Sequence, residues 1–291
     1  MRLSFIRSQR DEYPITALCR VMQVTRSGYH AWATREECSR VRTDRVLAVH
    51  VSAAFARSRR TYGSPRIHAE LRDEGVCIGR GRTARIMRES SLFARKKKAF
   101  RLSPRACSRD RIAPNRFDRK FRARGPNRKW VTDVKYIATN AGWLYLAPVI
   151  DLFSRRVVGC AMSTEQDGKL SLAALTSAVE ARGVAAGVVL HSDRGGIYGG
   201  DEYVTHLKRL GIRRSMSRTR NPWDNAVIES FFSTLRFELL DRMRFENQED
   251  AQRAITEWID CFYNSRRRHS TIGNISPMKY ELACAMRKQR T

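Results

Sequence analysis

Three carboxylates of this sequence lie in or beside apolar stretches, where a negative charge is unusual. Asp133 lies among apolar neighbours in the strand-like stretch WVTDVKYIA, although strand interiors disfavour Asp. Asp193 ends the apolar run GVVLHSD, and Glu229 lies in NAVIESFFSTLR, which otherwise has the pattern of an apolar helix. Burying a carboxylate is costly unless it is paired or bound to a metal ion. Converging carboxylates are hard ligands that suit Mg²⁺ or Mn²⁺, and two such ions about 4 Å apart promote displacement at phosphorus.

The elements around these residues predict an α/β fold. The chain after Trp130 reads as three strands, a helix ended by Gly183, and then two strands that alternate with helices. The expected strands are 130–138, 142–150, 155–163, 187–193 and 212–217, and the expected helices are 168–183, 200–211, 222–240 and 248–267. This order favours a mixed five-stranded sheet with helices on both faces. If the first and fourth strands are parallel neighbours, Asp133 and Asp193 meet and helix 222–240 presents Glu229 to both.

The front of the chain predicts two helical units, at 1–40 and 41–92. Residues 14–34 read as two short helices, the second capped by Thr25 or Ser27. Residues 62–90 read as a helix ended by Gly75 and a second helix rich in arginine, including Arg80, Arg82 and Arg85. Both units resemble helix-turn-helix modules that bind DNA. A small helical bundle that makes protein contacts is the alternative for each.

The charge of the chain points to a polyanion partner. The formal net charge is +27, and residues 92–129 carry 15 Lys/Arg against 2 Asp/Glu. We interpret 93–128 as a basic linker, including Lys96, Lys97 and Lys98, that lies along a phosphate backbone. A solvated spacer is the alternative. A second basic run at Arg266, Arg267, Arg268 and His269 suits phosphate contacts, although such runs are usually solvated.

Several classes of protein and site are disfavoured. No apolar run has the length of a transmembrane helix or a signal peptide, so we expect a soluble cytoplasmic protein. The seven cysteines form no CxxC pair, which argues against a disulfide framework and a zinc module. Asp151 reads as a turn residue rather than a ligand. His191 could orient Asp193, but a satisfied buried histidine is the simpler interpretation.

These motifs resemble the DDE catalytic core of retroviral integrases and transposases. Between Asp133 and Asp193 lie 59 residues, and between Asp193 and Glu229 lie 35, an interval familiar from that superfamily. The chain is similar to the second-frame transposases of two-frame bacterial insertion sequences. The similar stretches are WVTDVKYIAT, YLAPVIDLFSRRVVGCAMS, HSDRGGIY, NPWDNAVIESFFSTLRFELL, YNSRRRHSTIGNISPMKYE and, in the front half, YGSPRIHAELRDEG.

The resemblance implies an RNase H-like catalytic core at 129–268, followed by a helical tail at 269–291. It implies two Mg²⁺ ions, replaceable by Mn²⁺, with Asp133 bridging them and Asp193 and Glu229 on one ion each. It implies cleavage and strand transfer of the element's DNA, with Arg236 and Asn225 near the DNA end. The family commonly has Gln where this chain has Ile197.

The resemblance also implies partners. We expect double-stranded DNA of the element's ends and of a target, at least a dimer on that DNA, and the first-frame product as a possible fusion partner. The expected location is the bacterial cytoplasm, in association with the nucleoid. Two other functions stay open: a non-catalytic sequence-specific DNA-binding regulator, and an RNase H-like nuclease that only hydrolyses.

Overall fold

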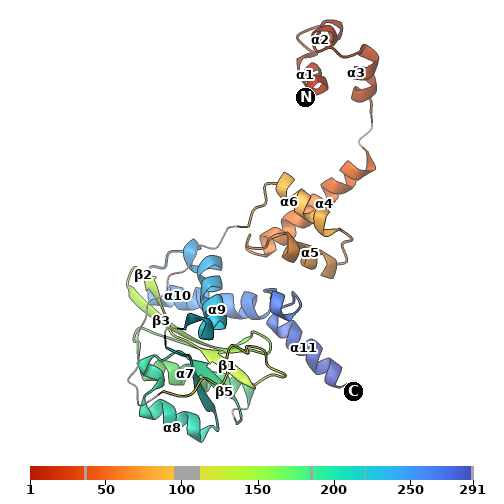
Figure 1. Cartoon of the computed structure of the whole chain (residues 1–291). Coiled ribbons are helices and arrows are strands. Elements are labelled where there is room, and N and C mark those ends of the chain that lie inside the picture. The colour runs from red at the N-terminus through yellow and green to blue at the C-terminus, as the bar shows by residue number, and fades with distance from the viewer. Residues whose placement is uncertain (36–37, 95–111, 184–185, 220, 290–291) are drawn as a thin grey trace.

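The computed structural model describes residues 1–35, 38–94, 112–183, 186–219 and 221–289 (Figure 1). The first unit contains α1 (Arg2–Gln9), α2 (Ile15–Val21) and α3 (Arg26–Ala33). Its small core is formed by Ile6, Leu18, Cys19 and Tyr29. Thr25 caps α3, because its hydroxyl oxygen accepts the N–H of Gly28 at 3.1 Å. The two expected helices are confirmed, and α1 is an addition that the sequence pattern had not indicated.

The second unit is a three-helix bundle of α4 (Ser39–Arg57), α5 (Ser64–Asp73) and α6 (Arg80–Glu89). Leu47, Val51 and Phe55 of α4 pack against Ile67 and Leu71 of α5 and against Ile86 of α6. Gly75 follows α5 with φ +78°, the left-handed conformation that glycine adopts without strain. The expected pair of helices at 62–90 is therefore confirmed.

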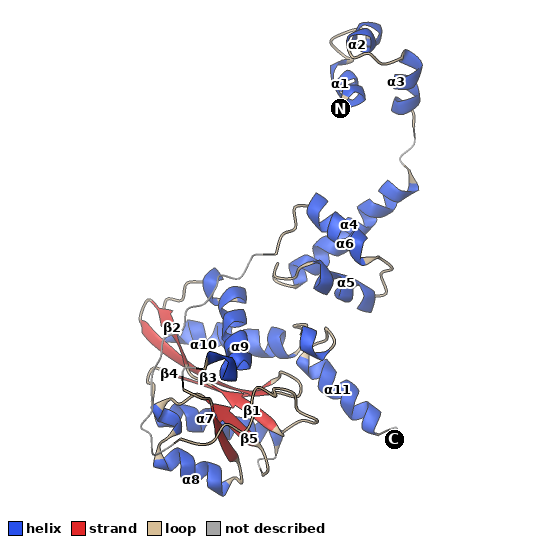
Figure 2. Cartoon of the chain, viewed as in Figure 1, coloured by secondary structure: helices blue, strands red, loops and turns tan. Residues whose placement is uncertain are grey.

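The second half of the chain, which we call the sheet half, is built on one mixed sheet of six strands (Figure 2). The strands are β1 (Lys129–Thr132), β2 (Lys135–Thr139), β3 (Gly142–Asp151), β4 (Val157–Ser163), β5 (Val189–Ser192) and β6 (Arg213–Met216). Their order is β2-β3-β1-β5-β6, with β4 paired to β3. The β3 strand is antiparallel to β1, β2 and β4, whereas β1, β5 and β6 are parallel. The predicted mixed sheet is confirmed, with one strand more than expected.

The extra strand arises because the stretch WVTDVKYIA is interrupted at Asp133. Both β1 and β2 pair with β3, in one continuous register from Thr132↔Val149 to Lys135↔Leu146. At the break, the Asp133 Oδ1 accepts the N–H of Val134 at 2.8 Å, so this donor bonds to a side chain instead of to the sheet. Pro148, which has no amide N–H, faces the break in the same register. The prediction that Asp133 lies in mid-strand is thus wrong: it follows the end of β1.

Helices cover both faces of the sheet (Figure 1). On one face α7 (Gly168–Arg182) and α8 (Asp201–Arg209) bury Trp130, Val149 and Leu190. On the other face α9 (Ala226–Glu238), α10 (Gln248–Glu257) and the π-helical η5 (Trp258–Asn264) bury Val131, Leu146 and Ile150. Gly183 ends α7 with φ +62°, as its place in the sequence predicted. The β1 strand therefore lies between two apolar layers.

The remaining helices are short or peripheral. The 3-10 turn η3 (Pro222–Asn225) leads into α9, and η4 (Leu240–Arg242) follows it, so the helix expected over 222–240 is in three parts. The 3-10 turns η2 (Gly196–Tyr198) and η6 (Ser270–Ile272) lie in loops, and α11 (Pro277–Lys288) is the last helix. No helix in the described ranges is long and apolar enough to cross a membrane.

Arg268 joins the second helical unit to the sheet half. Its guanidinium lies 2.5 Å from Glu70 and 2.7 Å from Asp73, both in α5. Its backbone N–H donates to the Tyr62 hydroxyl at 2.7 Å. The side chain of Arg268 is only 7% exposed, so charge-assisted bonds in a sheltered place connect the two parts.

The end of the expected linker packs against the sheet. Lys96, Lys97 and Lys98 lie outside the described residues. From Ile112 onward, however, the chain lies on the sheet half: Phe117 is buried in its core, and the N–H of Arg116 donates to the Ser215 hydroxyl at 2.9 Å. The prediction of a linker that extends to residue 128 is therefore wrong for residues 112–128.

Candidate active site

Two of the three carboxylates lie side by side at one edge of the sheet. The parallel strands β1 and β5 pair Trp130 with Leu190 and Val131 with His191. Two residues further along this register, Asp133 follows β1 and Asp193 follows β5. Carboxyl ends of neighbouring parallel strands are a common place for catalytic and ligand residues. The fourth predicted strand therefore brings Asp193 to Asp133 as expected.

The third carboxylate comes from α9. Ile228, Phe231, Phe232 and Leu235 form the apolar side of this helix and are buried against the sheet. Glu229 lies in the first turn of α9 and is only partly buried. The helix packs against β1, so the anchoring apolar residues fix where Glu229 is presented.

The charges of Asp193 and Glu229 both act on Asp133, which is buried. Burial, followed by the charge of Asp193 and then, among smaller effects, that of Glu229, raises the pKa of Asp133 to about 7. Burial also raises the pKa values of Asp193 and Glu229. Neighbouring negative charges in a place with little water create a demand for positive charge. Such a demand is what a divalent cation would satisfy.

The carboxylate oxygens of Asp133, Asp193 and Glu229 suit hard cations, although the three side chains do not form a compact metal-binding group. Within the ranges that the structure describes, no three His, Cys, Asp or Glu side chains form a compact metal-binding group. Two backbone hydrogen bonds orient the aspartates: Asp133 Oδ1 accepts from Val134, and Asp193 Oδ1 accepts from Gly195, each at 2.8 Å. Oxygen donors of this kind suit Mg²⁺ or Mn²⁺.

Lys135 is a residue of the site that the sequence reasoning missed. Burial raises the pKa values of Asp133, Asp193 and Glu229, and the charge of Lys135 partly opposes this rise. The Lys135 ammonium therefore lies within electrostatic reach of all three carboxylates. It begins β2, just beyond the break at Asp133. A basic residue two positions after the strand carboxylate was the available signal, but the break that places it was not visible in the sequence.

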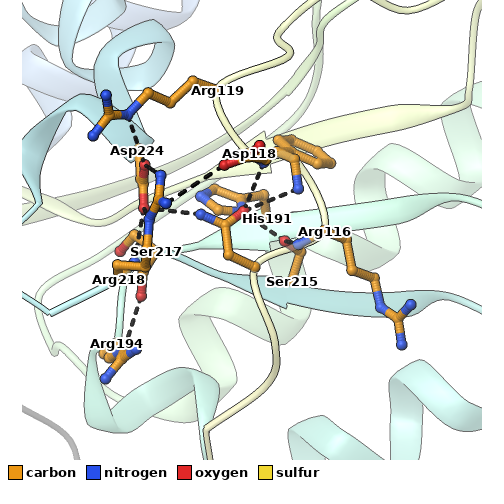
Figure 3. Close-up of polar contacts among 11 residues, drawn as sticks. Arg116, Asp118, Arg119, His191, Arg194, Ser215, Ser217, Arg218 and Asp224 are labelled. Carbon is orange, nitrogen blue, oxygen red and sulfur yellow. Dashed lines mark hydrogen bonds and ion pairs between the residues drawn. The ribbon is translucent and has the colours of Figure 1, made fainter.

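A further carboxylate, Asp224, is surrounded by polar contacts (Figure 3). Asp224 is 1% exposed, and hydrogen bonds from the Arg218 side chain are the main cause that lowers its pKa well below the ordinary value. Nearby, His191 is buried, its Nδ1 lies 2.8 Å from the Ser215 hydroxyl, and its ring stacks on Phe117 at 4.7 Å. Burial lowers the pKa of His191 to about 4, so it is a neutral, packed histidine near neutral pH.

The residues expected to contact DNA differ in their surroundings. Arg236 on α9 is 62% exposed and pairs with Asp241, and Asn225 ends η3 one turn before Glu229. Arg80 and Arg266 are exposed. Arg82 and Arg85 bind Asp44 of α4 at 2.6 and 2.7 Å.

Arg267 faces the protein interior. Its side chain is 5% exposed and pairs with the equally buried Glu238 at 2.9 Å. The expectation that Arg267 contacts DNA does not agree with this position, because its guanidinium is enclosed by the protein.

Two further residues have structural surroundings. The Asp151 carboxylate is buried and accepts the N–H of Asn127 at 2.8 Å and of Phe153 at 2.9 Å, which suits the turn that the sequence indicated. Ile197, which stands where the related family commonly has Gln, lies in η2 and packs against the apolar layer of α7 and α8.

The raised pKa of Asp133 has a consequence for stability. Between about pH 4 and pH 7 the folded chain holds a proton that the unfolded chain has released, so the free energy of unfolding should fall as the pH rises through this window. Asp133→Asn replaces this titrating carboxyl group by a neutral amide. At pH 8 the parent buries a charged carboxylate, so the variant should be more stable than the parent at that pH. Urea denaturation of both proteins at pH 5 and pH 8, without divalent metal, measures the difference. A difference that is the same at both pH values would contradict the assignment.

Comparison with known proteins gives a consistent result. Residues 123–222 and 210–277 match two models of an integrase core domain, and residues 42–100 match an HTH-like domain. The chain is 38% identical over 286 residues to the transposase InsF for insertion sequence IS3A of Escherichia coli K12, covering 97% of this chain and 98% of that protein. It is 39% identical over 263 residues to the IS600 uncharacterized 31 kDa protein of Shigella sonnei, covering 90% and 97%. The magnesium-bound catalytic core of HTLV-2 integrase superposes with a TM-score of 0.41 at 15% identity, over 55% of this chain and 99% of that one.

Proposed function

We propose that this chain, which belongs to the family of insertion-sequence transposases that includes InsF, cleaves the DNA ends of its own element and joins them to a new strand. Identity along nearly the whole chain confirms the relationship that the motifs indicated. The observation that supports the activity is the placement of Asp133 beside Asp193 at the carboxyl ends of β1 and β5, with Glu229 within electrostatic reach of Asp133.

Divalent metal is the cofactor that this site suits. We propose that Asp133, Asp193 and Glu229 would hold two Mg²⁺ ions, and that Mn²⁺ could replace Mg²⁺. Bound there, the ions would activate the attacking oxygen and stabilise the leaving one at phosphorus. Other parts of the site then have clear tasks: the N–H groups of Val134 and Gly195 orient the two aspartates, and α9 holds Glu229 over the strand ends.

The proposed reaction has two displacements at phosphorus. In the first, the oxygen of water attacks a phosphodiester at the element's end, the P–O bond to the 3′ oxygen breaks, and that oxygen takes up a proton to become a 3′-hydroxyl. In the second, this hydroxyl loses its proton as it attacks another phosphodiester and forms a new P–O bond. The P–O bond to the 3′ oxygen of that phosphodiester breaks, and the released oxygen takes up a proton. No covalent bond to the protein is required in either step.

The reaction requires partners that we also propose. Two DNA ends have to meet, so the active form is at least a dimer on double-stranded DNA. The exposed residues Arg236, Arg80 and Arg266, together with Asn225, are candidates for DNA contact. We further propose that the first-frame product supplies recognition of the ends as a fusion partner, and that the protein acts at the nucleoid in the cytoplasm.

A strand-transfer assay tests the proposed function. The full chain, with and without the upstream frame, is incubated with labelled duplexes that carry the ends of its own element and with Mg²⁺. Joined strands are expected in addition to cleaved ones. Cleavage without joining would instead identify a nuclease. Sequence-specific binding with neither product, in both forms of the protein, would identify a DNA-binding regulator.

A further inference from the structure

The buried Asp224 carboxylate forms the centre of a network of ionic and hydrogen bonds (Figure 3). Arg218 donates to it three times: from its backbone N–H and its Nε, each at 2.9 Å to Oδ2, and from Nη2 at 2.8 Å to Oδ1. The Asn115 amide donates to Oδ2 at 2.8 Å, and Arg119 Nε donates to Oδ1 at 3.4 Å. One carboxylate, itself almost inaccessible to water, thus joins the loop between β6 and α9 to the stretch that contains Asn115 and Arg119.

This network lies between two of the proposed metal ligands. Arg194 directly follows Asp193, and its Nε donates to the Ser217 carbonyl at 2.7 Å. The N–H of Ser217 in turn donates to the Ser192 carbonyl at 3.0 Å. Asp224 then stands five residues before Glu229, at the entry to α9. The loop between β6 and α9 is therefore fixed at the Asp193 end by main-chain contacts and at the Glu229 end by Asp224.

The stretch that contains Asn115 and Arg119 comes from outside the matched integrase core. Residues 112–121, which we call the strap, precede the first core match at residue 123. The strap is held to the sheet by Phe117, which stacks on His191, and by the bond from Arg116 to Ser215. The Asn115 side-chain oxygen accepts the N–H groups of Phe117 and Asp118 at 2.9 and 3.0 Å, so one amide both shapes the strap and reaches Asp224.

We propose that Asp224 is a positioning residue for DNA cleavage, and that the strap acts on Glu229 through it. Asp224 fixes the start of α9, so it sets where the Glu229 carboxylate stands relative to Asp193. This inference rests on the proposed function, because it gives Glu229 a catalytic task. The strap thus helps to shape the active site, in addition to supplying positive charge.

An exchange of the two partners tests the proposal. Asn115→Asp keeps the oxygen that shapes the strap but sets a second carboxylate against Asp224, and Asp224→Asn removes the central charge. Each single change should lower the single-turnover cleavage rate by about 100-fold, the scale of a misplacement of about 1 Å. The double variant removes the repulsion between the two carboxylates but not the loss of the Asp224 charge, so its rate should equal that of Asp224→Asn alone and not be the product of the two losses, since directly contacting residues are not additive.

The readouts separate positioning from general structural support. For the single variants the KM for a labelled duplex of the element's end should stay within about twofold of the parent, with the rate measured well below the melting temperature of each protein. Arg253→Gln, an exposed change on α10 whose side chain is 79% accessible, is the matched control and should change nothing. A parental rate for Asn115→Asp, or a double variant slower than both single variants, would overturn the proposal. If Glu229→Gln itself keeps full activity, the proposed function fails instead.

Discussion

Asp133→Asn and Glu229→Gln are each expected to reduce DNA cleavage and joining by about 10³-fold or more. Each change removes one oxygen ligand and one negative charge from the place where positive charge is required, and several kcal/mol of transition-state stabilisation are lost with it. The substituted side chains keep their size, so the fold and the DNA-binding surfaces stay intact. Rates are measured by quantifying cleaved and joined products from labelled element ends.

The same preparations provide the control. Binding to the end duplex, measured by fluorescence anisotropy, should remain within about twofold of the parent, since the exposed cationic residues that bind phosphate are unchanged. Asp250→Asn, on the surface of α10, is a suitable reference variant. Asp151→Asn is not, because Asp151 is buried. Joining that survives either carboxylate change would show that the catalytic residues lie elsewhere.

Glu238→Ala is expected to destabilise the chain by about 3–5 kcal/mol, because it leaves the Arg267 guanidinium buried without its counter-charge. Both side chains are almost inaccessible, and two hydrogen bonds of 3.0 and 2.9 Å connect Arg267 Nε to the Glu238 carboxylate. Urea denaturation followed by circular dichroism measures the loss.

Two comparisons sharpen this result. Replacing both partners by apolar residues of similar size, Glu238→Leu with Arg267→Met, should recover most of the lost stability. Asp250→Ala, which breaks a surface pair with Arg253, should change the free energy of unfolding by less than about 1 kcal/mol. A Glu238→Ala protein as stable as the parent would show that Arg267 reaches solvent, where it could contact DNA after all.

The features that were predictable from the sequence are those set by local rules. Gly75 and Gly183 end their helices because a left-handed conformation suits glycine, and Thr25 caps α3 because its hydroxyl can accept an N–H. The order of strands and helices predicted the mixed sheet, and hence the neighbouring ends of β1 and β5. The placement of Asp193 beside Asp133 follows from that order alone.

The features that escaped prediction depend on contacts between distant segments. The break at Asp133 involves Pro148, which lies on the facing strand. Arg267 belongs to a basic run typical of solvated surface, and its burial depends on Glu238, 29 residues earlier in the chain. The strap reads as charged linker because its anchors, Ser215 and Asp224, lie about a hundred residues later. A pattern within a window of sequence carries no information about such partners.

The bridge made by Arg268 has a geometric consequence. Its bonds to Glu70 and Asp73 hold the second helical unit at a set place relative to the sheet edge that carries Asp133 and Asp193. Any duplex that touches both parts must then present its two contacted stretches at a set separation along its axis. Since B-DNA turns by about 35° for each base pair, one inserted pair would rotate the distant stretch away from its contacts. In one protomer, the rotational position of the DNA along its axis would thus decide which phosphodiester bond lies at the carboxylates.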